Sequence, residues 1–82
     1  PRIYLDSPSG QLICISNTHI TDMDITVYDN MGRKLFEKLD TEVFPPATQV
    51  DCPTLISGSH GILIIQMVCN AQTTVTKAAF VK

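Results

Sequence analysis

Apolar and polar residues alternate along most of this chain, and residues that favour turns recur about every ten positions. In residues 23–28 the odd positions are apolar, whereas the even positions carry Asp24, Thr26 and Tyr28. Successive side chains of a β-strand point to opposite faces, so this segment is predicted to be a strand with one buried face. No apolar stripe at helical spacing persists along the chain, and the sequence therefore predicts an all-β fold.

The other predicted strands share β-branched or alternating residues and are bounded by glycine, proline, serine or asparagine. The full set covers residues 2–6, 11–17, 23–28, 33–38, 48–52, 62–69 and 73–82. Residues 62–69 are apolar on both faces except at Gln66, which is typical of a central strand. Short strands separated by turns at this spacing predict one domain over residues 1–82, an immunoglobulin-like antiparallel β-sandwich of about seven strands.

The stretch VYDNMGRKLFEK, residues 27–38, joins two of these strands and allows three interpretations. A phosphate-binding loop is disfavoured because Gly32 stands alone, without the further glycines and lysine that such loops need. A helix has some support, since Met31, Leu35 and Leu39 lie at helical spacing. A β-hairpin fits best, with Asn30 and Met31 in a type I turn and Gly32 in the left-handed conformation that closes a bulged loop.

Composition excludes several classes of partner. The chain has 82 residues, a formal charge of −2, 17% charged residues and no basic run, so it offers no electrostatic footprint for nucleic acid or an anionic membrane. The longest apolar runs, of which residues 62–65 are one, are too short for a membrane-spanning segment. The chain begins at Pro1 with neither an initiator methionine nor an apolar leader, which suggests a processed protein or part of a longer one.

The three cysteines are an odd number, so at least one has no partner within the chain. Cys14 and Cys69 fall on the second and the penultimate predicted strands, where immunoglobulin domains place a disulfide between their sheets. A Cys14–Cys69 disulfide is therefore possible. The alternative is a pair of buried thiols that act as small apolar side chains, with Cys52 unassigned in either case.

No residue cluster in the sequence predicts catalysis, a metal or a cofactor. His19 and His60 lack ligand spacing, and a zinc site made from Cys52, His60 and Cys69 would need those residues to converge by chance. Asp22, Asp24 and Asp29 lack the spacing of a calcium loop and suit a solvated strand face better. The expectation is a protein that is not an enzyme.

Three segments together resemble a known family. They are the pattern IxVYDxxGRxxF at residues 25–36, a Leu-x-x-Gly turn at residues 55–58, and the closing lysine-apolar strand at residues 77–82. This arrangement resembles the C-terminal sorting domain of type IX secretion cargo in Bacteroidetes. The chain departs from the family pattern at residues 5–10, LDSPSG, and at residues 61–63. Small stand-alone secreted immunoglobulin-like proteins of the same bacteria share the YDxxG hairpin and the final strand.

The resemblance implies a non-catalytic module that directs a secreted cargo through the type IX machinery to the cell surface. Its partner would be the secretion machinery or another envelope protein, and its location would be secreted, periplasmic or on the cell surface. The surface expected to be recognised combines the hairpin residues Asn30, Gly32 and Arg33 with Lys77 and Lys82 of the last strand. The alternative is a stand-alone secreted or envelope binding or adhesion module, and the sequence leaves its ligand and its oligomeric state open.

Overall fold

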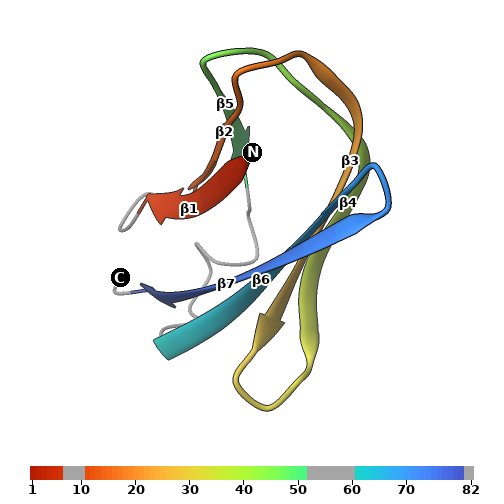
Figure 1. Cartoon of the computed structure of the whole chain (residues 1–82). Coiled ribbons are helices and arrows are strands. Elements are labelled where there is room, and N and C mark those ends of the chain that lie inside the picture. Colours follow the sequence, from red (N-terminus) through yellow and green to blue (C-terminus); the bar gives the residue numbers. More distant parts are fainter. Residues whose placement is uncertain (7–10, 52–60, 81–82) are drawn as a thin grey trace.

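A computed structural model describes the backbone of residues 1–6, 11–51 and 61–80, and the side chains of the same residues up to Lys77 (Figure 1). Within these ranges the regular structure consists of strands, and no helix suited to crossing a membrane is found there. The strands are β1 (Arg2–Asp6), β2 (Gln11–Ile15), β3 (Ile20–Asp29), β4 (Lys34–Val43), β5 (Ala47–Asp51), β6 (Gly61–Cys69) and β7 (Gln72–Phe80).

The strands form two antiparallel sheets, as Figure 1 shows. One has the order β1-β2-β5 and the other the order β4-β3-β6-β7. The second and fifth strands thus pair in one sheet while the third and sixth pair in the other, as in immunoglobulin-like sandwiches. The predicted all-β sandwich of seven strands is confirmed, and β6 is a central strand as its two apolar faces indicated.

The core lies between the two sheets and is built from alternate positions of the strands. Met23, Ile25 and Val27 of β3 are fully buried, which confirms the face expected from the odd positions. Leu63, Ile65, Met67 and Cys69 supply the corresponding face of β6, and Leu12 and Cys14 of β2 face them from the other sheet. The core contains no described aromatic residue that is fully buried, so aliphatic and sulfur-containing side chains carry most of the packing.

The third and fourth strands are longer than the sequence indicated. The prediction stopped them at residues 23–28 and 33–38, whereas β3 and β4 each have ten residues. Three register shifts along the β3–β4 ladder break the simple alternation, and Asp40 takes a positive φ of 53° at one of them. β4 then ends at Val43, before the Pro45–Pro46 pair whose missing backbone N–H groups cannot extend a ladder.

The difference in burial between the two faces of β6 leads to a prediction about stability. Ile65 is fully buried, whereas Ile62 on the same strand is 54% exposed. Replacing Ile65 with valine should lower the free energy of unfolding by about 0.5–1.5 kcal/mol, because it removes a methylene from a packed interior. The same replacement at Ile62 should change it by less than about 0.5 kcal/mol. Urea unfolding curves of both variants and the wild type measure the difference, and equal losses would contradict the assignment of the two faces.

Candidate recognition surface

The turn that joins β3 to β4, residues 29–33, has a defined hydrogen-bond pattern. The Gly32 amide donates to the Asp29 carbonyl at 3.1 Å, and the Asp29 amide donates to the Arg33 carbonyl at 2.9 Å. Gly32 has a φ of +87°, while Asn30 and Met31 keep negative φ values. These features define a type I turn closed by a left-handed glycine, so the predicted hairpin is confirmed and the alternative helix is wrong.

The Asp29 carboxylate fixes the shape of this loop. One oxygen accepts hydrogen bonds from the Met31 and Arg33 backbone amides, each at 2.9 Å, and the other accepts from Arg33 Nε at 2.7 Å. These donors, of which the Arg33 amide is the strongest contributor, hold the pKa of Asp29 below its ordinary value. Sequence reasoning treated Asp29 only as a solvated acid, although an aspartate directly before a turn is a known signal for such backbone bonds.

The fixed loop displays two large side chains to solvent. Met31 is 80% exposed, and the side chain of Arg33 is 79% exposed although its Nε is bonded to Asp29. Asn30 is also exposed. The sequence predicts Met31 as a turn residue, or as part of the disfavoured helix, and its display to solvent was not predicted.

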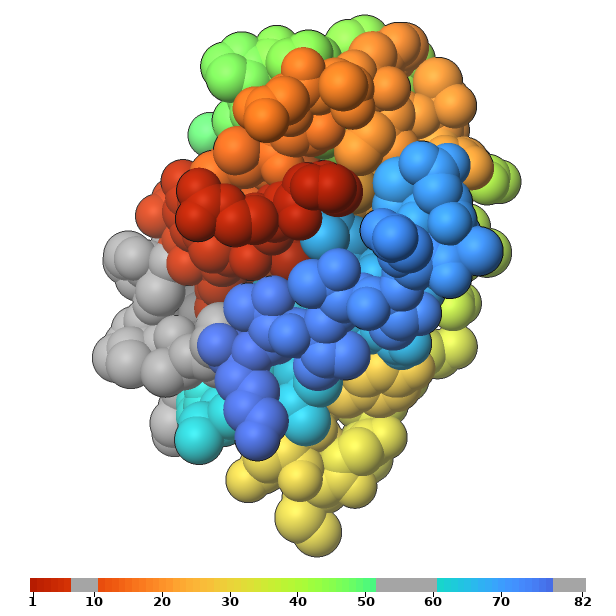
Figure 2. Space-filling view, in the orientation of Figure 1, coloured from red at the N-terminus to blue at the C-terminus, as the bar shows by residue number. Residues whose placement is uncertain are grey.

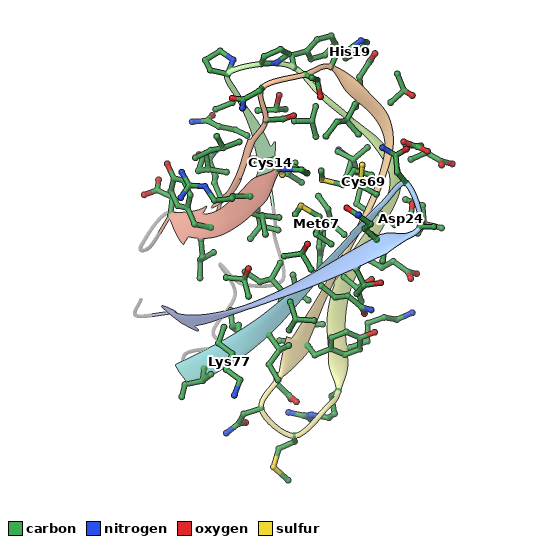
Figure 3. The ribbon with its side chains drawn as sticks, in the orientation of Figure 1. Cys14, His19, Asp24, Met67, Cys69 and Lys77 are labelled. Carbon is green, nitrogen blue, oxygen red and sulfur yellow. The ribbon has the colours of Figure 1, made fainter. Side chains whose placement is uncertain are left out.

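Lys77 lies on the outer face of the four-stranded sheet, at the same end as the hairpin (Figure 3). Register places it in one cross-strand row: Lys77 pairs with Ile64, Ile64 pairs with Tyr28, and Tyr28 pairs with Lys34. Neighbouring strands are about 4.8 Å apart, so Lys77 lies about 10 Å from Tyr28, the residue just before the loop. The structure therefore brings Lys77 toward Asn30, Gly32 and Arg33, whereas Lys82 lies outside the described residues.

The outer face beside Lys77 is more apolar than the open face of an antiparallel sheet usually is. Ile62 is 54% exposed and Val75 is 58% exposed, and Tyr28, Ile64 and Val68 are partly exposed on the same face. The Tyr28 hydroxyl donates to Gln66 Oε1 at 3.3 Å, which fixes the ring against the sheet. Contiguous apolar surface of this kind is typical of protein-binding regions. The two-sided apolarity of residues 62–69 was the sequence signal for this face.

The two described cysteines belong to the core and not to this surface. Cys14 and Cys69 are free thiols that point between the sheets beside Met67 (Figure 3), which corresponds to the alternative of two buried thiols. Burial raises the pKa of Cys14 to about 11, against a smaller opposing effect of the positive charge of Lys38. Cys14 is therefore protonated at neutral pH and is a poor nucleophile.

The remaining candidates for chemistry are His19 and the other potential metal ligands. His19 Nε2 lies 2.7 Å from Glu42 Oε2, and its ring stacks on Phe44 at a centroid distance of 4.8 Å. The hydroxyl of Ser16, three residues before His19, donates to the Thr18 carbonyl at 2.7 Å. No cluster of three histidine, cysteine, aspartate or glutamate residues occurs in the described ranges, and Cys52 and His60 lie outside them.

The conformation of Gly32 leads to a stability prediction. A β-carbon added there meets no atom within 4 Å, so the cost of substitution comes from the backbone alone. Gly32→Val should destabilise the protein by more than about 1 kcal/mol, because a β-branched residue strongly disfavours positive φ. Gly32→Asn should cost less, since asparagine tolerates this conformation. Thermal melts measure both effects, and coincident melts of Gly32→Val and wild type would exclude the left-handed turn.

Asp29 gives a prediction about pH. Its pKa is lower in the folded state, so its ionised form stabilises the fold above the unfolded-state value of about 3.9, and this contribution disappears as pH falls through the folded-state pKa. Asp29→Asn keeps an oxygen for the two amides but loses the charge facing Arg33. The wild type should therefore melt higher than Asp29→Asn at pH 7, and the difference should shrink toward pH 2. A difference that does not change between these pH values would contradict the assigned role.

Comparison with family models and with curated protein sequences gives no relative from which a site can be transferred. No protein-family model matches the chain, and no curated protein sequence matches it. Evidence for a function therefore comes from the residues and geometry of the chain itself.

Proposed function

We propose that this chain is a non-catalytic recognition module that acts as a C-terminal sorting domain, directing a secreted cargo through the type IX secretion machinery to the cell surface. The recognised region is the hairpin-end surface, defined as Asn30, Met31, Arg33 and Lys77. Its partner is a protein of the secretion machinery or of the cell envelope. Lys82 remains a further candidate contact from the sequence.

The observation that carries this proposal is the preorganised hairpin tip. The residues of the pattern YDxxGR are those that fix the loop: Asp29 binds its backbone, and Gly32 supplies the positive φ. The two positions that the pattern leaves open, Asn30 and Met31, and the Arg33 side chain remain exposed. A loop already held in one conformation loses little entropy on binding, and methionine and arginine are both enriched in protein interfaces.

Two hollows lined by described residues are smaller than typical small-molecule sites. A hollow of about 210 Å³ is lined by Pro1, Arg2, Ile15, Ser16 and Asn17, and a crevice of about 70 Å³ lies between Pro1 and the β6–β7 turn. Pockets that hold small molecules usually measure about 300–1,000 Å³. The exposed hairpin-end surface is better suited to a protein partner than these hollows are to a substrate.

Export of a reporter tests the proposal. The chain is fused behind a reporter in a bacterium with an intact type IX machine, and surface reporter is measured against a strain that lacks the machine. The double variant Met31→Ser/Lys77→Glu should reduce export at least about tenfold, equivalent to about 1.4 kcal/mol of lost binding free energy. The control Arg2→Glu reverses an exposed charge on β1, in the other sheet, and should leave export unchanged. Full export of the double variant would rule out the hairpin-end surface.

The same assay separates the sorting role from a binding or adhesion module. Removal of the final residues 81–82 should abolish export of a sorting domain. A binding module that is secreted by other means keeps its export after that deletion, and it also reaches the surface in the strain without the type IX machine. Either result would replace the proposed function with the alternative one.

A further inference from the structure

The four sheet edges formed by described strands differ in how well they resist pairing with another strand. β1 and β5 have five residues each, and β5 follows Pro45 and Pro46. β4 is long, but three register shifts and five charged residues interrupt it. These are the usual means by which proteins protect an edge. β7 has only one of them, a single charged residue, Lys77: its nine residues pair with β6 without a register shift.

Turn geometry identifies which backbone groups of β7 face away from β6. Cys69 pairs with Gln72 across a two-residue turn whose residues, Asn70 and Ala71, have φ values of 53° and 63°. Positive φ at both positions is the signature of a type I′ turn, in which the flanking residues form a hydrogen-bonded pair. Hydrogen bonding alternates along an antiparallel pair, so the even positions of β7 bond to β6. The N–H and C=O groups of Thr73, Val75 and Lys77 therefore face outward, and no described strand pairs with them.

We propose that β7 pairs with β7 of a second copy of this chain, antiparallel and centred on Val75, which joins two four-stranded sheets into one of eight strands. Val75 lies opposite its own copy, and Thr73 lies opposite Lys77 in both halves. All these positions carry outward N–H and C=O groups, so this register pairs the free backbone groups of both copies. The side chains of Thr73, Val75 and Lys77 lie on the outer face, and Val75, which is 58% exposed, gains an apolar neighbour. This inference does not depend on the proposed function.

Charge favours a second copy in this orientation. Lys77 does not lie opposite Lys77 of the other copy. It lies opposite Thr73 of the other copy, in the row that continues there through Val68 to Asp24. Asp40 is beside Asp24, since its amide donates to Asp24 Oδ1 at 3.1 Å. The antiparallel arrangement thus keeps the two lysines apart and places each of them in a row that ends at the acidic residues of the other copy. Figure 2 shows β7 at the surface along its coloured length, accessible to such a partner.

Sedimentation velocity of the purified chain in a reducing buffer tests the proposal. The mean mass should rise from the monomer value of 9.0 kDa toward twice that value as concentration increases. The protein concentrations should extend to about 1 mM. Pairing through a single strand buries less area than a standard interface, and small interfaces are typical of weak complexes. Val75→Lys places two lysines opposite each other and should raise the dissociation constant at least about tenfold. The control Ile62→Lys changes an equally exposed residue on β6, away from the edge, and should leave dimerisation intact.

Several outcomes would overturn the proposal. They are a wild type that stays monomeric throughout the series, a Val75→Lys variant that dimerises as well as wild type, or an Ile62→Lys variant that loses dimerisation equally, which would indicate contact between sheet faces. The register has its own measurement, a nuclear Overhauser contact between Thr74 Hα of one copy and Thr76 Hα of the other in a mixed-labelled sample. The melting temperatures of Val75→Lys and Ile62→Lys must match that of the wild type, which separates lost dimerisation from lost folding. None of these results depends on export.

Discussion

Burial of alternate side chains between two facing sheets is the constraint on which the rest of this structure depends. A domain of 82 residues buries a modest share of its surface, so its stability depends on a few central side chains. β3 and β6 supply many of them, with Ile25, Val27 and Ile65 at 0% exposure. A shift of one residue in either strand would turn this whole set toward solvent. The core therefore fixes the register, and the register fixes which residues share a row on the outer face.

The outer face is a consequence of that register and not of any contact between its own side chains. Four residues from four strands, Lys34, Tyr28, Ile64 and Lys77, form one row because their inward neighbours are packed in the core. The hairpin tip depends on the core less directly. Its shape is held by the Asp29 carboxylate and the positive φ of Gly32, so it is a rigid local structure carried at the end of a rigid sheet.

The sequence predicted the features that arise from local alternation and turn chemistry. Seven strands, the buried face of residues 23–28 and the turn at Gly32 all follow from side-chain parity or from a residue that tolerates positive φ. The length of β3 and β4 did not follow, because register shifts place Thr41 and Val43 in the core out of phase with the earlier positions. The association of Lys77 with the hairpin end did not follow either, since it depends on the order of strands within a sheet. That order is set by contacts between distant segments, which one-dimensional periodicity does not contain.

The two proposed surfaces use different properties of the same sheet. The hairpin-end surface offers side chains, and its backbone groups are largely occupied by Asp29 and the turn. The β7 edge offers backbone groups, and five of its nine residues are threonine or alanine, which have little discriminating chemistry. Recognition by side chains gives specificity, whereas strand pairing gives association that depends on shape and register. Lys77 contributes to both, because its side chain faces the hairpin end and its backbone faces the free edge. A partner at the hairpin end and a second copy at β7 would therefore share this residue, so binding of one should affect binding of the other.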